Sequence, residues 1–194
     1  MKRLIPFVMV AWVCASVSFG NFDITISNTY EGGTTFLESQ SLLITGGGAN
    51  IIEANGSSYI EVQNTATPLQ QGSAGIYALD LDDTSNLNFF NGALGGFYIY
   101  EDAQAVFSGG SIGFLHSYQD SDLLKHITFI CDVDSVSLAG NLLTGDWLDG
   151  KGSFSITLVN QPNYDSVYSN IHFVPEPATL VLFALGGLLL RRRK

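Results

Sequence analysis

Four short segments decide the expected fold: LLIT (residues 42–45), YIEV (59–62), ALDL (78–81) and FYIY (97–100). Their first residues are 17, 19 and 19 positions apart, and turn sequences such as NGSS and NGALGG separate them. One turn of a parallel β-helix needs about this length, and stacking the turns buries each apolar face against the next one. The repeat therefore predicts a right-handed parallel β-helix.

The rest of the body has the same character, because short runs of β-forming residues alternate with Gly, Asn, Asp and Ser turns. We therefore expect one all-β domain over residues 21–173. A β-sandwich is the alternative architecture, since short strands joined by hairpins produce a similar pattern. In ITFICDVD (127–134), Cys131 falls on the apolar face with Ile127 and Phe129, so this single cysteine of the body is expected in the core.

The segment GNLLTGDWLDG (140–150) is expected to close the open end of the stacked core. A stack of strands needs such a cap, because its last layer otherwise exposes apolar side chains and an unpaired edge. The apolar residues offered for this are Leu142, Leu143, Trp147 and Leu148. Gly145, Gly150 and Gly152 are expected to supply turn conformations.

The first 20 residues have the organisation of a secretory signal peptide. Lys2 and Arg3 precede an apolar stretch from Leu4 to Ala15, and small residues follow. Cleavage is expected before Asn21, with cleavage after Ser18 as the alternative. The Sec translocon and signal peptidase are therefore expected partners.

The body between the two ends is strongly acidic. Residues 21–174 contain Lys125 and Lys151, no arginine and 17 of the 18 acidic residues, which gives a formal charge of −15. Binding of nucleic acid is excluded, because it requires clustered Lys and Arg side chains. An acidic surface is typical of a soluble exported protein, or of one that collects divalent cations.

The acid-rich turn DLDDTSN (80–86) contains the candidate metal ligands Asp80, Asp82 and Asp83. An EF-hand loop beginning at Asp80 would need Gly at its sixth position and Glu at its twelfth, where Ser85 and Asn91 stand. We therefore expect no cofactor, with a looser Ca²⁺ site at these three carboxylates as the weaker alternative.

No arrangement of residues in the sequence predicts catalysis, so we expect no catalytic residues and a protein that is not an enzyme. GGSIG (109–113) matches the letters of the hydrolase motif G-x-S-x-G, but no alternation of strands and helices surrounds it. Tyr98 and Tyr100 alternate with Phe97 and Ile99, so one face of this strand is expected to present tyrosines. Such rings can stack on sugars.

The sequence VPEPATLVLFALGGLLLRRRK (174–194) has three parts in order. Pro175, Glu176 and Pro177 form a helix-breaking triplet, an apolar stretch from Ala178 to Leu190 is expected to form a single transmembrane helix, and Arg191, Arg192, Arg193 and Lys194 are expected to stop translocation. This arrangement resembles the PEP-CTERM sorting signal of Gram-negative bacteria.

The resemblance implies export, transient anchoring in the inner membrane and processing at or near the triplet by an exosortase. Proteins with this signal are associated with exopolysaccharide and biofilm, so exopolysaccharide is an implied partner and the cell surface or extracellular space the implied location. The function expected is therefore that of a structural surface or matrix protein. The alternatives are a glycan-binding or glycan-cleaving surface protein and a Ca²⁺-dependent adhesin.

Overall fold

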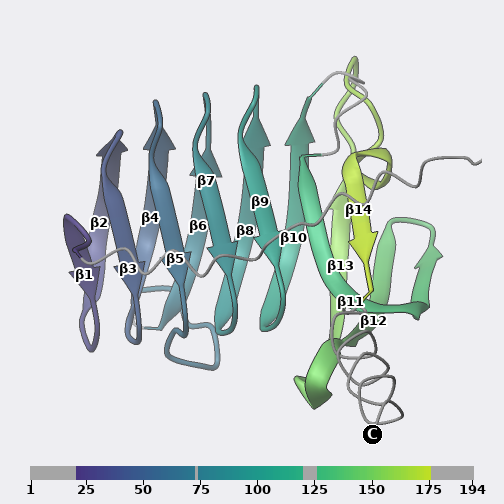
Figure 1. Ribbon diagram of the computed structural model, residues 1–194, viewed down its shortest axis with the longest axis horizontal. Coiled ribbons are helices and arrows are strands. Elements are labelled where there is room, and N and C mark those ends of the chain that lie inside the picture. The colour runs from purple at the N-terminus through teal and green to yellow at the C-terminus, as the bar shows by residue number, and fades with distance from the viewer. Residues whose placement is uncertain (1–20, 73, 120–125, 176–194) are drawn as a thin grey trace, which may run out of the picture.

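The computed structural model describes residues 21–72, 74–119 and 126–175 (Figure 1). The predicted signal peptide (1–20), the predicted membrane helix (178–190), Glu176, Pro177 and Arg191–Lys194 lie outside these residues. Within the described part of the chain, no helix is long and apolar enough to cross a membrane.

Most strands belong to one of two ladders in which neighbouring strands are parallel. Ladder A consists of β1 (Ile24–Ile26), β3 (Ser41–Ile44), β5 (Tyr59–Val62), β7 (Asn86–Phe89), β9 (Gln104–Phe107), β11 (Ile127–Ala139) and β14 (Ile171–Val174). Ladder B consists of β2 (Tyr30–Glu38), β4 (Gly48–Asn55), β6 (Gly75–Leu81), β8 (Ala93–Tyr100), β10 (Ser111–Tyr118) and β13 (Ser153–Val159).

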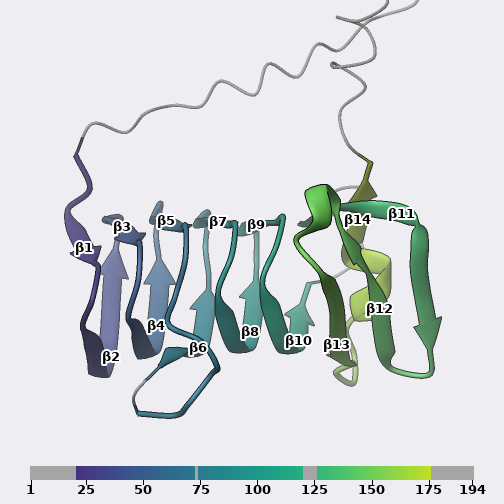
Figure 2. The same ribbon diagram turned by 90° about the horizontal axis from the view of Figure 1, so that it is seen from below.

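The two ladders lie opposite one another and are joined at one end (Figure 2). There β12 (Leu142–Trp147) pairs antiparallel with both β11 and β13, so that the described strands form one sheet folded back on itself. Two short 3₁₀ helices, η1 (Leu148–Gly150) and η2 (Val167–Asn170), lie near this end. The predicted all-β class is therefore confirmed.

The register of the ladders corrects the repeat inferred from the sequence. Leu42 pairs with Ile60 and Leu87 with Ala105, which are steps of 18 residues, but Ile60 pairs with Leu87, a step of 27. The long step accommodates the additional chain between the end of β5 at Val62 and the start of β6 at Gly75. The segments LLIT and YIEV therefore belong to ladder A, whereas ALDL and FYIY belong to ladder B.

The core is built from inward side chains stacked along each ladder. Phe89, Phe107 and Phe129 occupy paired positions of β7, β9 and β11, with ring centroids 5.7 Å and 5.3 Å apart. Phe97 of ladder B meets Phe107 edge to face at 5.2 Å, so the two ladders interlock across the core. Cys131, two residues beyond Phe129 on β11, is fully buried, as predicted.

The cap contains the predicted segment, with two differences. Leu143 and Trp147 are buried, and the indole Nε1 of Trp147 donates to the carbonyl oxygen of Gly110 (2.8 Å). Leu142, however, is exposed on the hairpin between β11 and β12. Gly145 lies inside β12 rather than in a turn, and its missing side chain leaves room for the ring of Phe154.

One corner of the fold repeats the same backbone conformation after successive strands of ladder B. A left-handed residue lies two positions beyond each of the mutually paired residues Leu37, Ala54, Leu81 and Ile99. These four residues are Ser39 (φ 63°), Gly56 (66°), Asp83 (54°) and Glu101 (46°). Side chains at these corner positions therefore lie next to one another in successive layers of ladder B.

Replacing Gly47 by Ala is expected to destabilise the fold more than replacing Gly140 by Ala. Both glycines have a left-handed φ (71° and 62°), so alanine costs about 1 kcal/mol of strain at either position. At Gly47 the new Cβ would also overlap the carbonyl oxygen of Thr29, whereas open space surrounds Gly140. Thermal unfolding of the two variants measures the difference, and equal losses would contradict the close approach at Gly47.

Candidate functional site

The predicted sorting triplet begins directly beyond the last strand. Pro175 follows β14 and borders a groove of about 460 Å³ that is lined by Cys131–Asp134 of β11, Leu148 and Phe173. Proline has no backbone N–H to donate, so it ends the pairing of β14 with β11. Pro175 is therefore the first residue beyond the strand pairing of β14.

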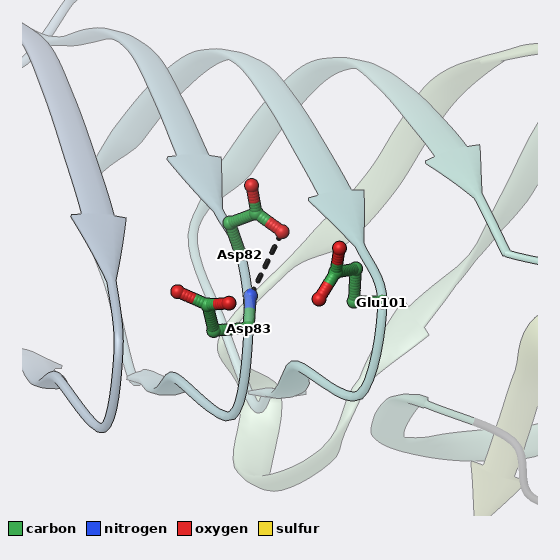
Figure 3. Close-up of side chains that lie close together, drawn as sticks. All are labelled: Asp82, Asp83 and Glu101. Carbon is green, nitrogen blue, oxygen red and sulfur yellow. Dashed lines mark hydrogen bonds between the residues drawn. The ribbon is translucent and has the colours of Figure 1, made fainter.

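The predicted metal ligands are separated by the fold. Asp82 and Asp83 lie together at the left-handed corner, where Glu101 joins them, and their carboxylate oxygens all lie within 4.8 Å of one another (Figure 3). Asp80 is not part of this cluster, because it lies on the outer face of β6. Sequence reasoning missed Glu101, which the ladder register brings next to Asp83 although 18 residues separate them.

Two of the three corner carboxylates already stabilise the backbone. Asp82 Oδ1 accepts a hydrogen bond from the N–H of Asp83 (2.8 Å), and Asp83 Oδ2 accepts one from the N–H of Gly56 (2.7 Å). The second bond ties the turn after β6 to the turn after β4. The corner carboxylates therefore have a structural role, and Glu101 brings a third acidic group to the same place.

Asp80 occupies a different environment on the outer face of ladder B. It pairs in register with Glu53 on one side and Tyr98 on the other. Burial, followed by the charges of Glu53 and Asp82, raises the pKa of Asp80 from 3.8 to about 6. Its Oδ1 atom is buried and has no hydrogen-bond partner among the described residues.

Aromatic side chains cover the same face next to Asp80. Phe97 and Ile99 are fully buried, whereas Tyr98 and Tyr100 lie on the outer face, as the alternation predicted. On the next strand, His116 stacks on Tyr98 and Tyr118 stacks on Tyr100, each with centroids 4.6 Å apart. The ring pairs are nearly parallel, with interplanar angles of 12° and 9°.

Other side chains hold these stacks in place. The ring of Phe114 lies over Gly96, where any Cβ would overlap it, and it meets Tyr98 edge to face at 5.7 Å. Burial lowers the pKa of His116, so its neutral ring accepts a hydrogen bond at Nδ1 from Gln161 Nε2 (2.9 Å). Tyr164 packs edge to face on Tyr118 at 5.4 Å.

The outer face of ladder B therefore combines stacked aromatic rings with unneutralised carboxylates. Burial, followed by the charge of Asp80, also raises the pKa values of Tyr98 and Tyr100, so both phenols stay protonated. The tyrosines of FYIY indicated this face from the sequence alone. The alternation in IGFLHSY (112–118) is the signal that could have added His116 and Tyr118.

The sorting signal is confirmed by comparison with known protein families. Residues 173–194 match the model of the PEP-CTERM protein-sorting motif. This motif marks an exported protein that an exosortase processes in Gram-negative bacteria. No characterised protein and no solved structure matches the chain.

Replacing Asp80 by Asn is expected to stabilise the protein at pH 7 to 8 by about 1 kcal/mol, after allowance for partial exposure. The pKa of Asp80 is raised in the folded state, so its protonated form favours folding and this contribution is lost as the pH rises from about 4 to about 6. D80N should therefore have a flatter pH dependence of unfolding over this range.

Urea unfolding at a series of pH values measures this effect. Asp102→Asn serves as the control, because it removes an exposed carboxylate from the turn after β8. This variant should keep the pH dependence of the wild type. Equal pH profiles for D80N and the wild type would show that Asp80 titrates as an ordinary exposed carboxylate.

Proposed function

We propose that the protein is an exported structural component of the cell surface or extracellular matrix, surrounded by exopolysaccharide. The position of the sorting motif is the observation that carries the proposal. The motif begins within β14, which ends at Val174, so cleavage beyond Pro175 leaves every described strand in the body. Processing would thus release a complete fold.

The charge distribution supports this route. Basic residues at both ends favour the cytoplasmic side of the membrane, and the acidic body between them is then the part that crosses. On this proposal the Sec translocon and signal peptidase act at residues 1–20. An exosortase acts near Pro175, Glu176 and Pro177.

We also propose that the body is a parallel β-solenoid rather than a β-sandwich. Parallel pairing throughout both ladders and the repeated 18-residue step support this assignment. A solenoid suits a structural role, because each layer contacts its neighbours and the outer faces present regular rows of side chains. The role proposed is not enzymatic.

Glycan binding is a second candidate function, and the aromatic outer face of ladder B favours it. Tyr98, Tyr100 and Phe114 lie side by side on β8 and β10 beside carboxylates that can accept hydrogen bonds from sugar hydroxyls. This combination of apolar rings and acceptors is suited to carbohydrate. A surface protein with such a face would hold matrix polymers without cleaving them.

Substituting the triplet Pro175, Glu176 and Pro177 by alanines is expected to block processing and leave the chain in the membrane fraction. An exosortase needs its recognition sequence, and a helix would no longer be interrupted before the apolar segment. Intact mass of the protein from cell-surface and membrane fractions measures the outcome in the source bacterium.

Pro162→Ala provides the matched control, because it changes a proline in the exposed loop after β13. This variant should be processed to the same mass as the wild type, apart from the substitution. A triplet variant that is trimmed normally and reaches the surface would overturn the proposed route.

Ca²⁺-dependent adhesion is a third candidate, and the cluster of Asp82, Asp83 and Glu101 favours it. On this alternative, about 1 mM Ca²⁺ should raise the Tm of the wild type, since a ligand that binds only the folded state stabilises it. Glu101→Gln should abolish the increase. A wild-type Tm that stays the same with Ca²⁺ and with a chelator would exclude metal binding at this corner.

A further inference from the structure

In the stacked pairs on ladder B, each tyrosine of β8 has one ring face covered by a side chain of β10. The centroid distance of 4.6 Å between Tyr98 and His116 is close to the strand spacing of about 4.8 Å, so the ring faces are directed along the ladder. His116 covers one face of Tyr98, and Tyr118 covers one face of Tyr100 in the same way. The faces that remain are directed toward β6.

Asp80 lies on β6 directly opposite the open face of Tyr98. The aspartate side chain is much shorter than that of tyrosine, so the ring extends beyond the carboxylate. Glu53, the partner of Asp80 on β4, stands on the other side. Glu53, Asp80 and Tyr98 therefore lie side by side on three neighbouring strands, and we call this part of the outer face, where two carboxylates adjoin a tyrosine ring, the notch.

The width of this notch limits what fits. Glu53 and Tyr98 are two strand spacings apart, about 9.6 Å, and the half-thicknesses of the two side chains occupy about 3.5 Å of this distance. About 6 Å remains, which admits an alkylammonium group or a single flat ring parallel to Tyr98, but not two stacked rings.

The chemistry of the notch selects for positive charge. Two carboxylates and the negative face of a tyrosine ring all attract a cation. Within the described residues, no lysine or arginine neutralises the carboxylates of Glu53 and Asp80. The single lysine there, Lys151, donates from its ammonium group to the carbonyl oxygen of Ser108. Anionic groups such as uronic acids are repelled.

We propose that the notch formed by Glu53, Asp80 and Tyr98 binds the primary ammonium group of an amino sugar within a glycan. An amino sugar is favoured over a lysine side chain because the neighbouring surface consists of the rings of Tyr100 and Phe114, against which a pyranose can place its C–H groups. This inference rests on the glycan-binding role proposed above and adds the chemical class of the sugar.

Calorimetric titration of the full chain in neutral detergent tests the proposal near neutral pH. The probes are a β-1,4-linked glucosamine tetramer, its fully N-acetylated counterpart and tetralysine. Loss of the ion pair and the cation–π contact should weaken binding of the acetylated tetramer about tenfold or more. Tetralysine should bind as weakly as the acetylated sugar.

Asp80→Asn and Tyr98→Leu should each weaken binding of the glucosamine tetramer about tenfold, with a Tm measurement to confirm that each variant is folded. Asp102→Asn removes the same unit of charge from the turn after β8 and should leave the affinity unchanged. The D80N result stands by itself if Y98L fails to fold.

Each other outcome identifies a different error. Equal binding of the two sugars would overturn the ammonium inference and leave glycan binding intact, whereas no binding of either sugar would overturn both. Tighter binding of tetralysine would indicate a peptide partner and contradict the inference. A D102N variant that weakens binding as much as D80N would show that general negative charge, rather than the notch, attracts the amine.

Discussion

The stacking of equivalent side chains along two parallel ladders is the constraint on which the rest of the structure depends. The row of Phe89, Phe107 and Phe129 exists because β7, β9 and β11 pair in one register. A slip of one residue would turn each of these rings outward, toward solvent. The body has one cysteine and its described part a single lysine, so neither an internal disulfide nor a network of ion pairs can stabilise it. Burial of these rows of apolar side chains is therefore the main source of stability.

The same register also organises the outer faces. Because the core residues of β8 and β10 are aligned, Tyr98 must lie beside His116 and Tyr100 beside Tyr118. The alignment of β4 and β6 likewise places Glu53 beside Asp80, where like charges oppose folding at neutral pH. The proposed binding face therefore lowers the free energy of unfolding, as functional sites commonly do.

The accuracy of sequence reasoning depended on the range of the interaction. Alternation within one strand correctly placed Cys131 and Phe97 inside and Tyr98 outside. The equivalence of strands was wrong, because the 27-residue step between β5 and β7 interrupts the repeat and moves ALDL to the other ladder. Glu101 was missed for a related reason, since nothing near it in the sequence indicates that it lies beside Asp83.

The sequence by itself determined the all-β class and the presence of the sorting motif at residues 173–194, because strand alternation and the motif are both local, linear signals. Tertiary structure alone decided which strands are neighbours, which carboxylates meet at the corner and which rings leave a face open beside Asp80. The physical reason is that a parallel strand bonds to a partner 17 to 44 residues away, and loop lengths and core packing select that partner.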